Sequence, residues 1–172
     1  MTKKNTKKLI IGAMLSALSV AAMLVGAFLE VLDLSVGVIA SGAVIFALLE
    51  LRGSYPVMIW LSSGILSLLL LPNKLPAVYF LLFFGWYPIA KLFFERLIFP
   101  LCWALKILCF CVSAVSMYFI GNLIVPIEDM IGWAAPVLLV LSVAVFVLYD
   151  IALSRIILSY VRVWRHRLKI KI

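Results

Sequence analysis

The residues of this chain that could do chemistry are few, and they do not combine into a catalytic set. The one histidine, His166, lies in a strongly basic C-terminal segment. Ser62 and Ser63 could be sought as nucleophiles, but the sequence offers no general base beside them, and such a serine needs one. There is also no metal-ligand cluster, phosphate loop or dinucleotide fingerprint. We therefore predict no catalytic residue, no metal and no cofactor, and expect that the protein is not an enzyme.

Two charged residues, Lys106 and Asp150, stand inside long apolar stretches, where a charge costs several kcal/mol. At ~1.5 Å per residue, Lys106 lies about 10 Å from one end of its stretch, and Asp150 about 24 Å from the opposite side of a core ~30 Å thick. These depths agree to within about one helical turn, which predicts an intramembrane ion pair. The pair could serve an ion-coupled relay, or it could be a structural salt bridge. Lys106 could also extend alone towards the interface.

The elements that carry these residues are apolar and uninterrupted. The chain has 172 residues, of which 67% are hydrophobic and 13% charged, and its mean hydropathy is +1.26. A soluble domain of this size has too little interior to bury so much apolar surface. The runs also lack the alternating polarity of barrel strands. We predict an all-α, polytopic integral membrane protein with a single transmembrane domain over 1–172. Its six transmembrane helices cover about 9–29, 34–51, 55–71, 77–94, 100–125 and 133–161, before a basic tail over 162–172.

The distribution of charge predicts an orientation in the membrane. Lys and Arg next to short spans tend to stay in the cytoplasm. The basic residues gather at the N-terminus, in the C-terminal tail and at alternate span ends, whereas Lys74 is the only base at the other ends. We therefore predict six spans with both the N and C termini cytoplasmic. The net charge of +8 reflects these signals and contact with the lipid bilayer, so no nucleic-acid partner is expected.

A ladder of small residues marks the first span. Ala13, Ala17 and Ala21 are four residues apart, so they share one helix face on which another helix can approach closely. This lysine-capped helix with its A-x-x-x-A element, in a basic six-span protein of under two hundred residues, resembles the substrate-binding S components of energy-coupling factor (ECF) transporters. In that family the first-helix alanines lie against a transmembrane coupling subunit. The resemblance thus implies a docking role for Ala13 and Ala17, and we assign Ala21, the next residue of the ladder, to the same partner-docking face.

The same resemblance implies a function, a location and partners. S components bind vitamins or other small micronutrients for uptake and work with an ATP-driven coupling module that contains ATPases. The chain would then be a multi-pass protein of the bacterial plasma membrane. An uptake subunit meets its ligand from outside, so the ligand-binding groups would lie at the outer span ends. The candidates there are Glu30, Asp33, Asn73, Lys74, Tyr79, Tyr118, Asn122, Glu128, Asp129 and Trp133. Carboxylates outnumber the single lysine in this set, which favours a neutral or cationic solute.

A second interpretation stays open: a small, non-catalytic membrane protein that scaffolds or assists partner membrane proteins. The segment FFGWYPIAKLFFER, residues 83–96, would then face the partner. Two local features are expected within it. Gly85 and Pro88 predict a helix kink, since proline cannot donate a backbone hydrogen bond. Lys91 and Glu95 are four residues apart and should form an ion pair on one helix face.

Overall fold

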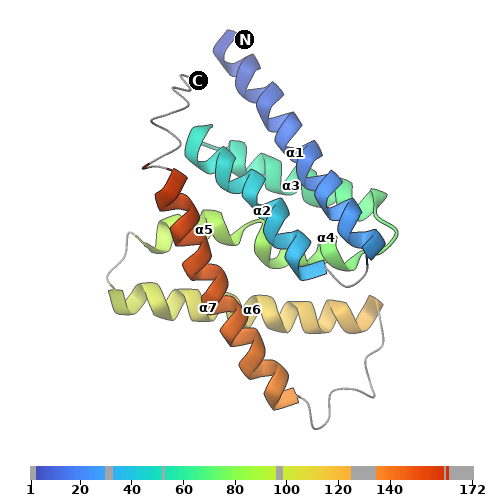
Figure 1. Ribbon diagram of the computed structural model, residues 1–172, viewed down its shortest axis with the longest axis vertical. Helices are drawn as coiled ribbons and strands as arrows, with labels where there is room; N and C mark the ends of the chain where they lie inside the picture. Colours follow the sequence, from blue (N-terminus) through green and yellow to red (C-terminus); the bar gives the residue numbers. More distant parts are fainter. Residues whose placement is uncertain are drawn as a thin grey trace. The chain divides into compact units, whose positions relative to one another are not determined.

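The computed structural model describes residues 3–29, 33–51, 53–95, 99–124, 135–160 and 162 of the chain. These residues form helices and turns without any strand, which confirms the all-α prediction for the described part. One five-residue stretch, η1, is a π-helix. The elements, shown in Figure 1, are α1 (Lys3–Leu29), α2 (Asp33–Glu50), α3 (Tyr55–Leu70), α4 (Leu75–Tyr79), η1 (Phe80–Phe84), α5 (Tyr87–Phe94), α6 (Phe99–Ile124) and α7 (Ala135–Ser159).

Within the described ranges, five helical segments are long and apolar enough to cross a bilayer. The remaining predicted span, 55–71, corresponds to α3, an apolar helix of 16 residues. At ~1.5 Å per residue α3 is about 24 Å long, which is shorter than a hydrocarbon core of ~30 Å. The structure therefore agrees with a multi-pass α-helical membrane protein. The five candidate spans are Thr6–Leu29, Asp33–Glu50, Leu75–Phe94, Pro100–Ile120 and Val140–Ser159.

The chain divides into two compact units. Helices α1 to α6 belong to the first unit, and α7 belongs to the second. Within the first unit, side-chain contacts between neighbouring helices show which of them run parallel and which antiparallel. The prediction of one transmembrane domain over 1–172 stays a prediction.

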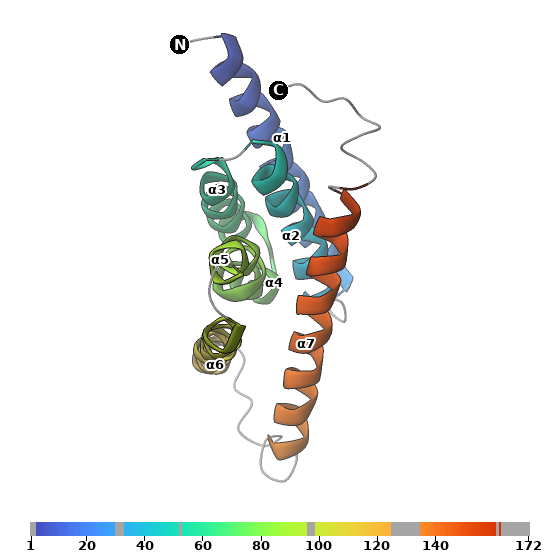
Figure 2. The ribbon, with the colours of Figure 1, turned by 90° about the vertical axis from the view of Figure 1, so that its left-hand side faces the viewer.

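Helices α1 and α2 form an antiparallel hairpin. At one end of the hairpin, the ammonium Nζ of Lys8 lies 3.3 Å from the carbonyl oxygen of Leu51, just after α2. In the middle, the hydroxyl Oγ of Ser19 lies 3.2 Å from the carbonyl oxygen of Ala40. At the other end, Gly26 packs against α2. Figures 1 and 2 show the two helices side by side.

Helix α3 runs parallel to α1 and packs beside it. The Nζ of Lys8 lies 5.9 Å from the centre of the Tyr55 ring, and Gly12 faces the Ile59 side chain one turn further along both helices. The turn between α2 and α3 contains Gly53 with a φ of 67°, a conformation that glycine adopts without steric cost. Lys8 therefore lies where the start of α1, the end of α2 and the start of α3 meet.

The next span, formed by α4, η1 and α5, runs antiparallel to α3. A Cβ added to Gly64 would collide with Leu81, and one added to Gly85 would collide with Trp60, so each glycine admits a side chain from the facing segment. On its other side this span packs against α6, and Figure 2 shows α5 between α3 and α6. The aromatic rings of Phe83 and Phe110 lie 6.2 Å apart across that contact.

The predicted kink appears as a break between η1 and α5. The N–H of Gly85 donates to the carbonyl of Phe80, five residues earlier, over 2.7 Å, which is the π-helical pattern. The α-helix resumes after Trp86, whose carbonyl accepts from Ala90 at 3.0 Å. Pro88 stands in the first turn of α5, where a missing N–H costs least. Glycine and proline therefore mark this place, as expected, although the π-helical turn was not predicted.

Side chains bond the backbone at this break. The carbonyl of Leu82 lies 2.5 Å from the indole Nε1 of Trp86 and 3.1 Å from the hydroxyl of Ser113, which comes from α6. Inside a membrane an unsatisfied carbonyl costs several kcal/mol, so irregular backbone persists only where such donors are supplied. Ser113 therefore joins α6 to the weakest point of the preceding span.

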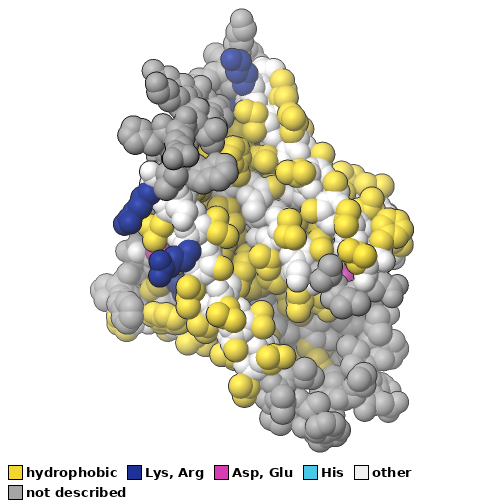
Figure 3. Space-filling view, in the orientation of Figure 1, with side chains coloured by type: hydrophobic (Ala, Val, Ile, Leu, Met, Phe, Trp, Pro, Cys, Tyr) yellow, Lys and Arg dark blue, Asp and Glu magenta, His cyan; other side chains and the backbone are white. Residues whose placement is uncertain are grey.

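The outward faces of these helices are strongly apolar. Large hydrophobic side chains are more than half exposed on every long helix, for example Met14 on α1, Leu69 on α3, Phe119 on α6 and Leu148 on α7. Figure 3 shows hydrophobic side chains over most of the described surface on one face of the molecule. Surface of this kind suits contact with lipid rather than water.

Candidate functional site

Small residues on α1 occupy two different faces. Gly12 and Gly26 are buried against the side chains of α3 and α2, respectively. The predicted docking residues Ala13, Ala17 and Ala21 are all exposed. They therefore lie on an exposed face of α1. The docking role itself stays a prediction, but the alanines are accessible to another helix.

The predicted ligand groups at the far end of the first unit are partly brought together. The side-chain amide Nδ2 of Asn73 lies 3.5 Å from the carboxylate Oδ2 of Asp33, so it joins the start of α2 to the turn after α3. The Oδ1 of the same amide accepts from the N–H of Leu75 at 3.0 Å. The Nζ of Lys74 donates to the carbonyl of Leu71, at the end of α3. These contacts stabilise the α3–α4 turn, and each of the three polar residues already has a structural role.

The other members of that set are dispersed or lie outside the described part. Tyr79 is half-buried at the end of α4. Tyr118 is 51% exposed on α6, with its ring 6.0 Å from that of Phe119. Asn122 belongs to α6. A ligand site built from the whole set stays a prediction. The remaining members, Glu30, Glu128, Asp129 and Trp133, fall outside the described residues.

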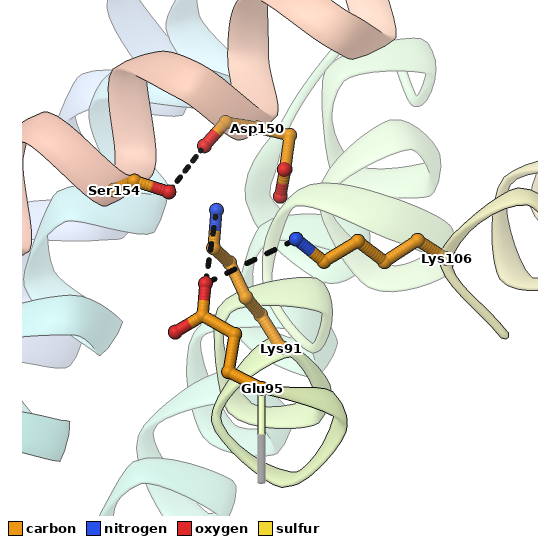
Figure 4. Close-up of polar contacts among 5 residues, drawn as sticks. All are labelled: Lys91, Glu95, Lys106, Asp150 and Ser154. Carbon is orange, nitrogen blue, oxygen red and sulfur yellow. Dashed lines mark hydrogen bonds and ion pairs between the residues drawn. The ribbon is translucent and has the colours of Figure 1, made fainter. Parts of the chain in front are cut away.

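The best-defined charged site lies at the opposite end, where α5 meets α6. The Nζ of Lys91 lies 3.7 Å from Oε1 of Glu95, which confirms the predicted ion pair. The Nζ of Lys106 lies 3.9 Å from the same oxygen. Figure 4 shows both lysines extending from their helices to this one carboxylate. We call Lys91, Glu95 and Lys106 the lysine–glutamate cluster.

Burial makes this cluster unusual. The side chain of Lys91 is 0% exposed and that of Lys106 is 7% exposed, whereas Glu95 is 43% exposed. Both N–O separations exceed hydrogen-bond distance, so the attraction is one of charge. The Nζ of Lys106 also lies 5.6 Å from the ring centre of Trp103, within cation–π range. The cluster therefore places two ammonium groups in a largely dry environment around one partly hydrated carboxylate.

Sequence reasoning missed that Glu95 is near Lys106. The signal was present, because the two residues are only eleven apart in the sequence and Pro100, a helix breaker, lies between them. The end of α5 lies beside the start of α6, so a charge on each can meet. Asp150, the predicted partner of Lys106, lies on α7 in the second unit, where its backbone carbonyl accepts from the Ser154 hydroxyl at 3.1 Å (Figure 4). The predicted pairing of Lys106 with Asp150 stays a prediction.

Much of the segment 83–96, which the scaffold interpretation assigned to a partner, is buried in the described part, and the partner-facing role stays a prediction. Phe83, Phe84 and Tyr87 are each at most 5% exposed, and Lys91 is fully buried. The rings of Phe83 and Tyr87 stack at 4.9 Å within the first unit. The aromatic side chains are inside because η1 and α5 lie between α3 and α6. Of the described residues in this segment, Phe93 is the large apolar side chain that is strongly exposed.

No group of three or more His, Cys, Asp or Glu side chains in the described ranges could hold a metal ion. The three cysteines, all on α6, are free thiols. Comparison of the chain with protein-family models, with curated proteins and with solved structures gives no match.

Proposed function

We propose that the chain crosses the membrane six times, with both termini in the cytoplasm and α3 as the short third span. In the first unit, the start of α1, the end of α2, the start of α3 and the start of α6 share one end with the lysine–glutamate cluster. This end holds Lys7, Lys8, Lys91 and Lys106, whereas the opposite end holds Lys74. The positive-inside rule makes the lysine-rich end cytoplasmic.

Reporter fusions test this topology. A reporter fused after Lys74 should indicate the outside, and one fused after Lys171 should indicate the cytoplasm. If α3 does not cross the membrane, the reporter after Lys74 will indicate the cytoplasm. That result would contradict the six-span arrangement.

We further propose that the protein is a solute-binding subunit of the cell membrane that takes up a vitamin or another small micronutrient with an ATP-driven coupling module. The observation that supports this proposal is the exposed position of Ala13, Ala17 and Ala21. Small residues in a span usually serve close helix packing, yet these three are exposed on α1. A helix of a coupling subunit could pack closely against this exposed face.

Substitution by tryptophan tests the docking face. Ala17→Trp should abolish association with a transmembrane coupling protein and its ATPases, because the bulky ring separates the two helices. Ile65→Trp is the matched control, since Ile65 is 55% exposed and belongs to α3 rather than to the ladder of α1. The tagged protein would be purified in mild detergent and the retained proteins identified by mass spectrometry. Equal retention by both variants would refute the docking role.

The exposed alanines also suit a non-catalytic scaffold that binds another membrane protein without moving a solute. The two functions differ in what accompanies the protein. Mass spectrometry of the purified wild-type protein should reveal a bound metabolite if it is an uptake subunit. A partner without ATPases and without a small molecule would favour the scaffold.

A further inference from the structure

The π-helical turn η1 is held firmly by its neighbours. A Cβ on Gly37 of α2 would lie 2.6 Å from Cδ2 of Phe84, and a Cβ on Gly64 of α3 would collide with Leu81. Each glycine therefore receives a side chain of η1 in the space that a larger residue would fill. Because side chains of η1 fit against Gly37 and Gly64, the segment before the break is packed closely on α2 and α3.

The segment after the break is held differently. Gly85 and Trp86 form a turn between η1 and α5, and Trp60 of α3 packs directly on Gly85. The indole Nε1 of Trp60 is buried, and among the residues that the structure describes it has no hydrogen-bond acceptor. A buried donor of this kind is rare, particularly among membrane helices, and calls for an explanation. A second conformation that supplies an acceptor would explain it.

We propose that Gly85 and Trp86 form a hinge, about which α5 pivots relative to the anchored η1, and that Trp60 is its latch. In the described conformation the indole of Trp60 covers Gly85 without an acceptor for its N–H. In the pivoted conformation the N–H donates to a backbone carbonyl of the 84–86 turn, since each carbonyl can accept two hydrogen bonds. Bistable packing around a helix break is a known basis for such transitions.

The hinge lies between the two ends of the first unit, so a pivot can move one end and leave the other in place. Helix α4, before the hinge, follows the turn of Asn73 and Lys74, which contacts the start of α2. Helix α5, after the hinge, carries Lys91 and is followed by Glu95. A pivot at Gly85 therefore changes the lysine–glutamate cluster while α4 stays in place. The hinge does not depend on which solute or partner the protein binds.

Pulsed electron resonance on spin-labelled protein in lipid nanodiscs tests the hinge. Labels at Phe93→Cys on α5 and Met14→Cys on α1 would report the pivot, because both side chains are more than 60% exposed. The native cysteines on α6 would first be replaced by serine. A pivot of about 20° on the eight-residue arm of α5, ~12 Å long, moves its end by roughly 4 Å. The wild-type protein should therefore give two distances that differ by about this amount.

Two substitutions should shift the populations in opposite directions. Trp60→Phe removes the N–H and should deplete the pivoted conformation. Gly85→Ala forces the indole away from residue 85 and should enrich it. Gly42→Ala is the control, because nothing lies within 4 Å of a Cβ there, and it should match the wild type. A single, unchanged distance in the wild type and Trp60→Phe would overturn the hinge, even if Gly85→Ala failed to fold. So would a Trp60→Phe population shifted towards the pivoted state.

Discussion

The contact between α1 and α2 can be tested by adding a single methyl group. Gly26→Ala would put a Cβ 2.5 Å from Cγ2, 2.8 Å from Cβ and 2.9 Å from Cγ1 of Val36. Carbon atoms in contact prefer about 3.5–4.0 Å. Val36 is 5% exposed and branched at Cβ, so its side chain cannot rotate out of the way. The two helices must therefore separate.

The size of the effect follows from a comparison with Gly42→Ala. Alanine is better than glycine within a helix by about 1 kcal/mol, and this gain is common to both variants. It cancels when the two are compared. Overpacking typically lowers the free energy of unfolding by about 1–3 kcal/mol. Only Gly26→Ala should show this loss, because Gly42 faces open space. The free energy of unfolding of Gly26→Ala should thus be lower than that of Gly42→Ala by about 1–3 kcal/mol.

Reversible unfolding in mixed micelles, followed by circular dichroism or tryptophan fluorescence, measures this difference. Gly42→Ala should unfold at the same denaturant fraction as the wild type or later, and Gly26→Ala should unfold earlier. If the two variants unfold within about 0.5 kcal/mol of each other, a difference smaller than the usual cost of overpacking, the close approach of α1 and α2 at Gly26 is refuted.

Three further predictions concern polar contacts and use the same unfolding assay. Glu95→Gln should lower the free energy of unfolding by roughly 1–3 kcal/mol, because it removes the carboxylate shared by two buried lysines; the partial exposure of Glu95 limits the loss. An unchanged free energy of unfolding would show that the two lysines do not depend on this carboxylate. Ser113→Ala should cost less, about 0.5–1.5 kcal/mol, because the Leu82 carbonyl keeps its other donor; a loss above that of Glu95→Gln would contradict this order. Lys106→Met and Asp150→Asn test the ion pair predicted from the depths of the two residues in the membrane. Each change alone should destabilise the protein, and the double variant should recover part of the loss. Additive losses would exclude the ion pair.

Features that depend on one stretch of chain could be predicted from the sequence. The apolar runs have lengths that only membrane-crossing or deeply buried helices need, and the observed helices begin and end within about two residues of most predicted bounds. The pairing of Lys91 with Glu95 follows from helical spacing alone. The break near Gly85 follows from glycine and proline chemistry. Helix α4 begins at Leu75, two residues before the predicted start. The prediction treated Pro76 as a helix breaker, but proline is well suited to the first turn of a helix.

Features that depend on two segments could not be read from the sequence in this way. The π-helical turn has neighbours from two other helices: Ser113 of α6 donates to the Leu82 carbonyl, and the Trp60 ring of α3 packs on Gly85. Neither neighbour can be identified from local composition. The depth argument compared Lys106 with Asp150, which is distant in the sequence, and overlooked Glu95, whose carboxylate lies 3.9 Å from the Lys106 ammonium. Local sequence patterns thus predict the helices and the break within one of them, whereas tertiary packing determines which side chains contact each other at that break.

The contacts of α1 also bear on how the chain is inserted during synthesis. Lys8 reaches the carbonyl of Leu51, a group made 43 residues later, which takes roughly 2–9 s at about 5–20 residues per second. Ala40, the partner of the Ser19 hydroxyl on α2, is also made later, 21 residues after Ser19. The same hydroxyl lies 3.1 Å from the carbonyl of Leu15 in its own helix. A first helix inserted before its neighbours would therefore have this polar group satisfied, and the hydroxyl would share its proton with Ala40 once the hairpin closes.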